Sequence, residues 1–141
     1  MPLENLYREI ILDHFKSPRN FGKLEHPAVV AHHENPLCGD KIELQIAIDE
    51  GFKISEIKFY GHGCAISQAS ASMMTVAVKE KSIDEVRKLM SRFKSLFSDE
   101  APASDVVEWG ELKALEGVKK FPTRVECATL AWIALEKCLK H

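Results

Sequence analysis

The sequence predicts one α+β domain spanning residues 1–141, in which helices pack on one face of an antiparallel sheet. The length of 141 residues suits a single domain with a core of its own. A stretch with the two-residue alternation of strands lies between stretches with helical periodicity. This order of helix, strands and helices is typical of α+β domains, and we find no internal repeat or second domain.

The first half of the chain predicts a helix followed by short strands. Apolar residues recur at helical spacing from Leu3 to His14, and a Ser-Pro pair then ends the pattern. Apolar and polar residues alternate after that, and an Asp-Glu-Gly turn at 49–51 separates two of the strands. The predicted strands are residues 29–33, 41–49 and 54–60. Two or three neighbouring strands with short links favour an antiparallel sheet.

The second half predicts helices. Small residues fill positions 65–80, which favours close packing on the sheet, and a capping box from Ser82 to Glu85 starts the next helix. A short helix at 109–115 is expected to close near Gly117 after a polar loop, and Pro122 opens the last helix. The expected inward faces are Val86, Leu89, Met90, Phe93 and Phe97, then Cys127, Leu130, Ala131, Ala134, Leu135 and Cys138.

Composition excludes several classes of function. The net charge of −2 provides no basic surface for nucleic acid, and no apolar run approaches the roughly 20 residues of a membrane span. Residues 1–15 lack the pattern of a signal peptide, so we expect a cytoplasmic protein. In that reducing compartment the four cysteines are expected to be core residues, metal ligands or nucleophiles rather than disulfides.

Cys38 and Asp40 lie two residues apart in a turn with the sequence Asn-Pro-Leu-Cys-Gly-Asp. A thiolate and a carboxylate that point to one place can bind zinc or iron. Alone, the pair is equally consistent with a surface loop that carries an incidental cysteine.

Cys64 follows a predicted strand and opens a predicted helix in the sequence Gly-His-Gly-Cys. The positive end of a helix favours thiolate, and the glycines let the backbone approach a bound group. A nucleotide-binding loop is excluded because Ile66 stands where the third glycine would be. The alternative for Cys64 is a small buried apolar residue.

Cys127 lies in an early turn of the last helix, where Arg124 adds positive charge. Cys138 lies on the same apolar stripe 11 residues later, and core packing explains it. The six histidines form no recognisable metal motif: His32 and His33 are expected on opposite faces of a strand, and His62 is at most an outer partner of Cys64.

Taken together, four ordered segments resemble the IscU/SufU class of iron–sulfur cluster assembly proteins, which includes the N-terminal domain of NifU. These segments are residues 13–22, 35–40, 61–67 and 124–132, so the resemblance covers nearly the whole chain. The resemblance implies a three-stranded antiparallel sheet covered by helices. It also implies that Cys38, Cys64 and Cys127 gather at one end, where with Asp40 they would hold zinc or a transient iron–sulfur cluster.

Three features lean toward SufU-type members of this class. Glu126 stands where IscU-type members have histidine, residues 121–125 depart from their Leu-Pro-Pro-Val-Lys motif, and 62 residues separate Cys64 from Cys127. The resemblance implies that a pyridoxal-phosphate cysteine desulfurase donates sulfur, with Cys38 as the acceptor, and that apo-proteins or carriers receive clusters. Any enzymatic activity would be at most that of a sulfurtransferase-like acceptor.

The choice between zinc and a cluster as cargo stays open from the sequence, as does a scaffold role. A static zinc domain that only mediates protein contacts is the alternative. A zinc hydrolase is disfavoured, because four protein ligands leave no open position for water.

Overall fold

A computed structural model describes residues 3–36, 39–97 and 110–140, and its sheet confirms the predicted topology. Strands β1 (Val29–Glu34), β2 (Lys41–Ile48) and β3 (Ile54–His62) form an antiparallel sheet in the order β1-β2-β3. The alternation in β2 places Ile42, Leu44 and Ile46 in the core. The turn at 49–51 is closed by the Asp49 side chain, which accepts the backbone N–H of Gly51 at 2.9 Å.

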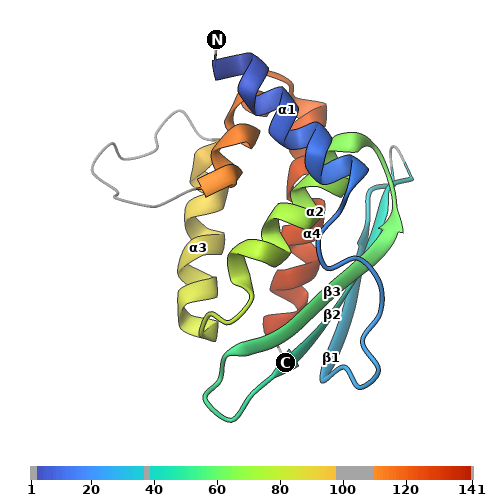
Figure 1. Cartoon of the computed structure of the whole chain (residues 1–141), viewed down its shortest axis with the longest axis vertical. Helices are drawn as coiled ribbons and strands as arrows, with labels where there is room; N and C mark the ends of the chain where they lie inside the picture. The colour runs from blue at the N-terminus through green and yellow to red at the C-terminus, as the bar shows by residue number, and fades with distance from the viewer. Residues whose placement is uncertain (1–2, 37–38, 98–109, 141) are drawn as a thin grey trace.

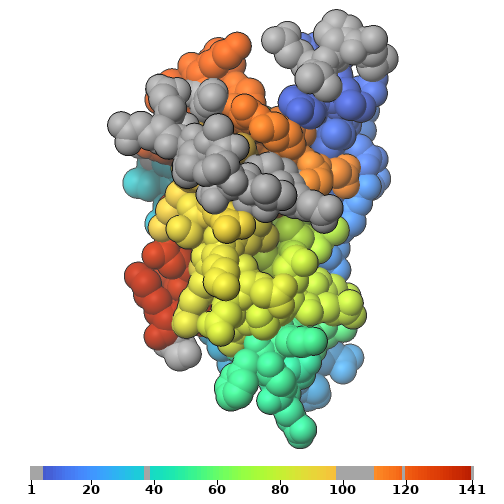
Figure 2. Space-filling view, turned by 90° about the vertical axis from the view of Figure 1, so that its left-hand side faces the viewer, coloured from blue at the N-terminus to red at the C-terminus, as the bar shows by residue number. Residues whose placement is uncertain are grey.

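The helices lie on one side of this sheet, as predicted (Figure 1). They are α1 (Leu3–Lys16), α2 (Ala65–Val78), α3 (Ile83–Leu96), the 3₁₀ helix η1 (Gly110–Lys120) and α4 (Pro122–Leu139). Helix α4 packs on β1 and β2, and α2 packs on β3, while α1 contacts α2 and η1. On the side away from the sheet, α3 forms much of the surface, with α2 beside it (Figure 2).

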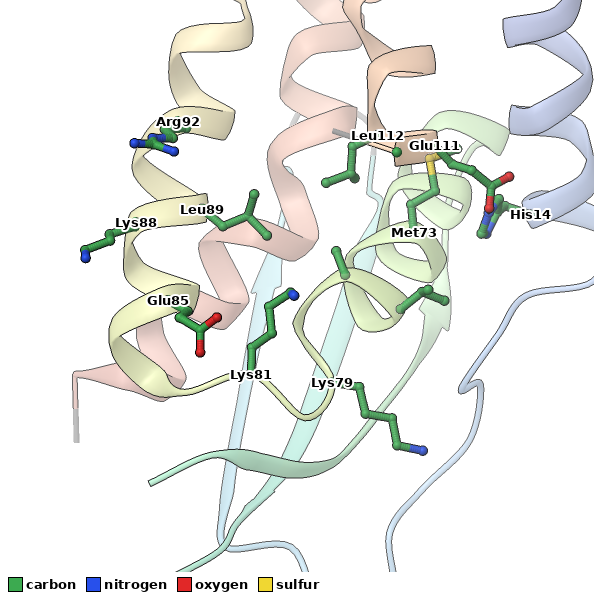
Figure 3. Close-up of a pocket in the computed structure, with 13 residues that line it drawn as sticks. His14, Met73, Lys79, Lys81, Glu85, Lys88, Leu89, Arg92, Glu111 and Leu112 are labelled. Atoms are coloured by element: carbon green, nitrogen blue, oxygen red, sulfur yellow. The ribbon is translucent and has the colours of Figure 1, made fainter. Parts of the chain in front are cut away.

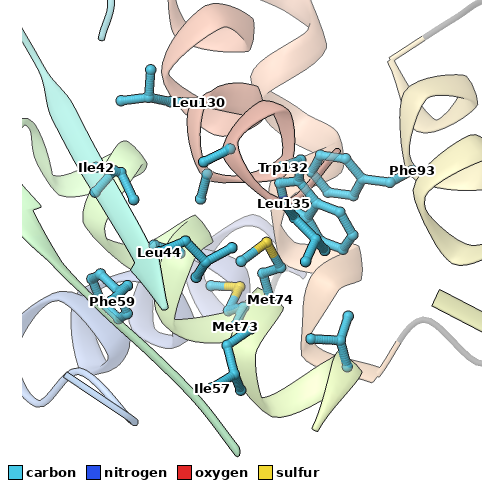
Figure 4. Close-up of a cluster of buried hydrophobic side chains, with 14 of the residues drawn as sticks. Ile42, Leu44, Ile57, Phe59, Met73, Met74, Phe93, Leu130, Trp132 and Leu135 are labelled. Atoms are coloured by element: carbon cyan, nitrogen blue, oxygen red, sulfur yellow. The ribbon is translucent and has the colours of Figure 1, made fainter. Parts of the chain in front are cut away.

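The core joins the sheet to α2 and α4 (Figure 4). Met73 and Met74 of α2 are buried against inward-facing strand residues such as Leu44. The rings of Phe93 and Trp132 stack at 4.0 Å between centroids and tie α3 to α4. The indole N–H of Trp132 donates to the Ser70 hydroxyl at 3.2 Å, so its polar group is satisfied inside the core.

Two predicted helix details need correction. The short helix does not close near Gly117, because η1 continues to Lys120 and α4 begins two residues later at Pro122. Leu6 belongs to the apolar pattern predicted from Leu3 to His14, yet it is 44% exposed, whereas Ile10 and Ile11 pack against the core and His14 is buried. The predicted capping box at Ser82 and Glu85 is present, whereas the predicted polar loop after α3 lies outside the described residues.

No helix within the described ranges is both long and apolar enough to cross a bilayer.

Cys138 is a core residue, as predicted, and its side chain is 1% exposed on the inner face of α4. Burial raises the pKa of its thiol to about 11, so this cysteine is neutral and unreactive near neutral pH. We expect Cys138→Ala to cost on the order of 1 kcal/mol of stability and to leave metal content unchanged. Denaturant unfolding and elemental analysis of the same preparation test this; a loss of metal would contradict the core assignment.

Candidate metal centre

One carboxylate and two thiols from distant parts of the chain meet at one end of the sheet. One ligand atom each from Asp40, Cys64 and Cys127 lies within 4.8 Å of the other two. The strand register explains why Asp40 and Cys64 are close. Lys41 of β2 pairs with His62 of β3, so Asp40, just before β2, and Cys64, just after β3, lie at the same end of the sheet. Helix α4, which packs on β1 and β2, supplies Cys127.

Cys64 is the N-cap residue of α2 and has extended backbone angles (φ −71°, ψ 171°). Its side chain does not cap the helix, so the thiol can take part in the group with Asp40 and Cys127. The partial positive charge at the start of a helix favours an anion at this position, and the partly exposed thiol lies there. The prediction that Cys64 follows a strand and opens a helix is therefore confirmed.

Asp40 is 7% exposed, and the start of α2 holds its carboxylate. Its Oδ2 atom accepts the backbone N–H of Cys64 and the hydroxyl of Ser67, both at 3.1 Å. Asp40 thus places a negative charge at the N-terminus of α2 where Cys64 offers no side-chain cap. Sequence reasoning missed Ser67, although its position three residues after the N-cap is where such a contact forms.

Backbone hydrogen bonds close the loop that precedes Asp40. The N–H of Asn35 donates to the carbonyl of Asp40, and the N–H of Gly39 donates to the carbonyl of Asn35, both at 2.8 Å. Gly39 has φ +75°, a left-handed conformation that glycine adopts without strain. Cys38, the remaining predicted site residue, lies outside the described residues, so its place in the site stays a prediction.

Cys127 lies in the second turn of α4, after Pro122 at the first helical position. Its side chain is 6% exposed, and Sγ is 3.6 Å from the carbonyl oxygen of Thr123. The neighbouring Glu126 accepts the side-chain N–H of Asn35 at 3.5 Å, which links α4 to the loop before Asp40. Cys138, roughly 16 Å further along the same helix, is not a member of the group.

Gly63 is required for the close approach of Asp40 to α2. A Cβ at this position would lie 2.4 Å from Ser67 Oγ and 2.9 Å from Asp40 Cγ. We expect Gly63→Ala to displace the carboxylate and to weaken metal binding at least about tenfold, as loss of an outer partner of a metal ligand does. Gly117→Ala is the matched control, because a Cβ there meets no atom within 4 Å. Zinc titration against a chelator gives the measurement, and equal affinities for the two variants would contradict this account.

The histidines stay outside the candidate metal-binding group found within the described residues. His32 is exposed and His33 partly buried, as expected for opposite faces of β1. His14 is buried, with Nε2 3.2 Å from Glu111 Oε1 and Nδ1 2.7 Å from Ser72 Oγ. Because a carboxylate only accepts, Nε2 donates and Nδ1 accepts in the neutral ring, so His14 is a structural link between α1, α2 and η1.

A cavity of about 540 Å³ lies at the other end of α2, between α2, α3 and η1 (Figure 3). Lys81 points into the gap between α2 and α3, while Met73 and Leu112 provide apolar lining. Its lining includes none of Asp40, Cys64 and Cys127, so this cavity is separate from the candidate metal centre.

Comparison with known proteins identifies the family. The family model for the NifU-like N-terminal domain matches residues 6–128. The zinc-dependent sulfurtransferase SufU of Bacillus subtilis strain 168 is 45% identical over 135 residues, which cover 96% of this chain and 90% of SufU. The iron–sulfur cluster assembly scaffold protein IscU of Streptococcus pyogenes serotype M1 is also 45% identical, over 99% of this chain and 86% of that protein.

Solved structures agree with this result. A crystal structure of a hypothetical protein has a TM-score of 0.85 and 42% identity, covering 98% of this chain and 99% of that one. A candidate cluster-assembly scaffold protein for the SUF system from Fervidobacterium islandicum AW-1 has a TM-score of 0.79 and 34% identity, covering 93% and 94%. The matched residues 6–128 include the whole group of Asp40, Cys64 and Cys127. This chain therefore belongs to the family of NifU-like N-terminal domains.

Proposed function

We propose that this protein works in iron–sulfur cluster assembly by accepting sulfur from a cysteine desulfurase at a zinc site. The ligands are Cys38, Asp40, Cys64 and Cys127, and the cytoplasm, where thiols stay reduced, is the expected setting. The observation that carries the proposal is the convergence of Asp40, Cys64 and Cys127 within 4.8 Å, in a fold whose relatives include a zinc-dependent sulfurtransferase.

The chemistry of these donors suits zinc. Thiolates bind zinc at about 2.3 Å and carboxylates at about 2.0 Å, so ligand atoms of a tetrahedral site lie roughly 3.5–3.8 Å apart. A separation of at most 4.8 Å is within a small side-chain movement of that spacing. Bound zinc would keep the cysteines in their thiolate form and would confine them to one place.

In the proposed transfer, Cys38 supplies the nucleophile. Its thiolate attacks the terminal sulfur of a persulfide on the pyridoxal-phosphate desulfurase, so that a new S–S bond forms on Cys38. The S–S bond on the enzyme breaks, and the electron pair leaves with the enzyme's own thiolate, so the exchange involves no net oxidation. Cys64 and Cys127 are anchored in or at helices, which suits ligands that stay in place during this exchange.

A scaffold role for a transient iron–sulfur cluster is the second candidate. The same thiolates can bind iron, and the Streptococcus pyogenes relative with the same 45% identity is named as a scaffold. In that role, apo-proteins or carriers would receive the finished cluster. One oxygen ligand among sulfurs would make the site easier to open in either case.

The test compares zinc-loaded protein with protein stripped by a chelator, each mixed with a cysteine desulfurase and free cysteine. We expect zinc-loaded protein to increase alanine production, and stripped protein to lose this effect until zinc is returned. Equal rates with both forms would contradict the proposal and would favour a static zinc domain. A cluster that forms when iron is added would assign the scaffold role.

A further inference from the structure

Ser67 lies at the junction between the loop of Asp40 and the start of α2. Its side chain is 0% exposed, and it is the third residue of α2, after the N-cap Cys64. Its hydroxyl oxygen is 3.1 Å from Asp40 Oδ2 and also 3.1 Å from the carbonyl oxygen of Cys64. A serine hydroxyl has one proton, so it donates to only one of these two acceptors at a time.

We propose that Ser67 is the positioning residue of the metal centre: it orients Asp40 as a ligand and redirects its hydrogen bond to the Cys64 carbonyl when Asp40 moves away. This inference rests on the proposed function, because it assigns Asp40 to a metal ion. It adds a device that makes Asp40 exchangeable while Cys64 and Cys127 remain in place.

The relative strengths of the two hydrogen bonds set the order of events. A hydroxyl donates more strongly to a carboxylate than to a neutral carbonyl, so Ser67 donates its hydrogen bond to Asp40 while Asp40 occupies the site. The hydrogen bonds from Cys64 and Ser67 both go to Oδ2, and a carboxylate has about four lone-pair positions, so these two bonds do not prevent the carboxylate from also binding an ion.

When Asp40 withdraws, the Ser67 hydroxyl needs another acceptor, because an unsatisfied buried donor is costly. The Cys64 carbonyl lies at the same distance and already accepts the backbone N–H of Gln68 at 3.1 Å, which leaves its second lone pair for the hydroxyl. Rotation of one hydroxyl therefore replaces the lost bond without any movement of the helix.

Gly63 and Cys64 hold the Asp40 carboxylate close to the start of α2. Gly63 has no side chain, and a Cβ there would lie 3.0 Å from Asp40 Oδ2, so the carboxylate approaches the backbone as closely as glycine permits. The backbone N–H of Cys64 donates to Asp40, and its thiol belongs to the candidate metal centre, so Cys64 links the carboxylate to the proposed metal ligands.

A double-mutant cycle tests the inference through zinc release rather than activity. Four proteins are compared: wild type, Ser67→Ala, Asp40→Ala and the double variant. Each is loaded with zinc and mixed with excess chelator, and the rate of zinc release is recorded. We expect Ser67→Ala to release zinc about tenfold faster than wild type. In the Asp40→Ala background the same substitution should change the rate less than about twofold, because Ser67 acts through Asp40.

Ser70→Ala is the matched control. Ser70 is equally buried on α2, but its hydroxyl donates to the Ala128 carbonyl of α4 rather than to Asp40. We expect it to lower stability without changing zinc release in either background. Ser67→Thr keeps the hydroxyl and should stay within about threefold of wild type, which separates the hydroxyl's role from packing.

Cobalt substitution provides a second readout that a packing role would not change. Ser67→Ala should alter the visible absorption of bound Co²⁺ when Asp40 is present and leave it unaltered in the Asp40→Ala background. Equal effects of Ser67→Ala on zinc release in both backgrounds would overturn this inference and leave the proposed function standing. A wild-type protein that binds no zinc would overturn both.

Discussion

Cys64→Ala is expected to lose tightly bound zinc and to abolish stimulation of a cysteine desulfurase. Cys64 lies at the start of α2, within 4.8 Å of the ligand atoms of Asp40 and Cys127. Removal of its thiolate leaves an incomplete set of ligands, and zinc affinity should fall by more than the roughly 10–100-fold that loss of an outer partner costs. Because the side chain is only partly buried and does not cap the helix, the fold should persist.

Cys138→Ala is the control for this experiment, since it removes a thiol from the core at the far end of α4. We expect Cys138→Ala to keep the wild-type zinc content and the wild-type stimulation of the desulfurase. We expect Cys64→Ala to lose both. Elemental analysis after gel filtration and an alanine-production assay measure the two properties. Retention of zinc by Cys64→Ala with wild-type affinity would remove Cys64 from the proposed ligands.

Asp40→Ala is expected to have the second largest effect, on both metal exchange and stability. The variant loses the acceptor for the Cys64 N–H, whereas the Ser67 hydroxyl can turn to the Cys64 carbonyl, so we expect a cost of about 1–3 kcal/mol without unfolding of the chain. Zinc should become more labile because three thiolates would hold it without the carboxylate. Desulfurase stimulation should fall if the protein is a sulfur acceptor.

The same variant separates the two proposed roles. Its assays are desulfurase stimulation and the lifetime of a reconstituted iron–sulfur cluster. Loss of stimulation, with no cluster in either protein, supports the sulfur acceptor. A longer-lived cluster in the variant supports the scaffold, because the exchangeable ligand is gone. Wild-type behaviour in both assays would exclude Asp40 from the site.

The fold was largely predictable because its local signals agree with its tertiary structure. The alternation at 41–48 survives as β2, since one face of the sheet is covered by α2 and α4 and must be apolar. The Ser82–Glu85 capping box depends only on residues close in sequence, so it could be recognised directly. The extent of η1 was not predictable, because its length depends on contacts with α1 and α4 rather than on Gly117.

The candidate site was predicted in part. The place of Cys64 before a helix and of Cys127 within one follows from local patterns, and the resemblance to the family brought them together with Asp40. The sequence could not show that Asp40 is held by α2, because this contact depends on the register that pairs Lys41 with His62. The role of Ser67 could not be predicted either, because its partner Asp40 is 27 residues away in the chain.

Mass spectrometry of the zinc-loaded protein after one turnover of a cysteine desulfurase tests the central claim most directly. The protein is mixed with a desulfurase that carries a persulfide, alkylated and digested, and the peptides with Cys38, Cys64, Cys127 and Cys138 are compared. We predict one added sulfur atom on the Cys38 peptide, and none on the Cys138 peptide, whose thiol is buried and neutral. Absence of added sulfur on all three proposed site cysteines, in protein that still contains its zinc, would contradict the account.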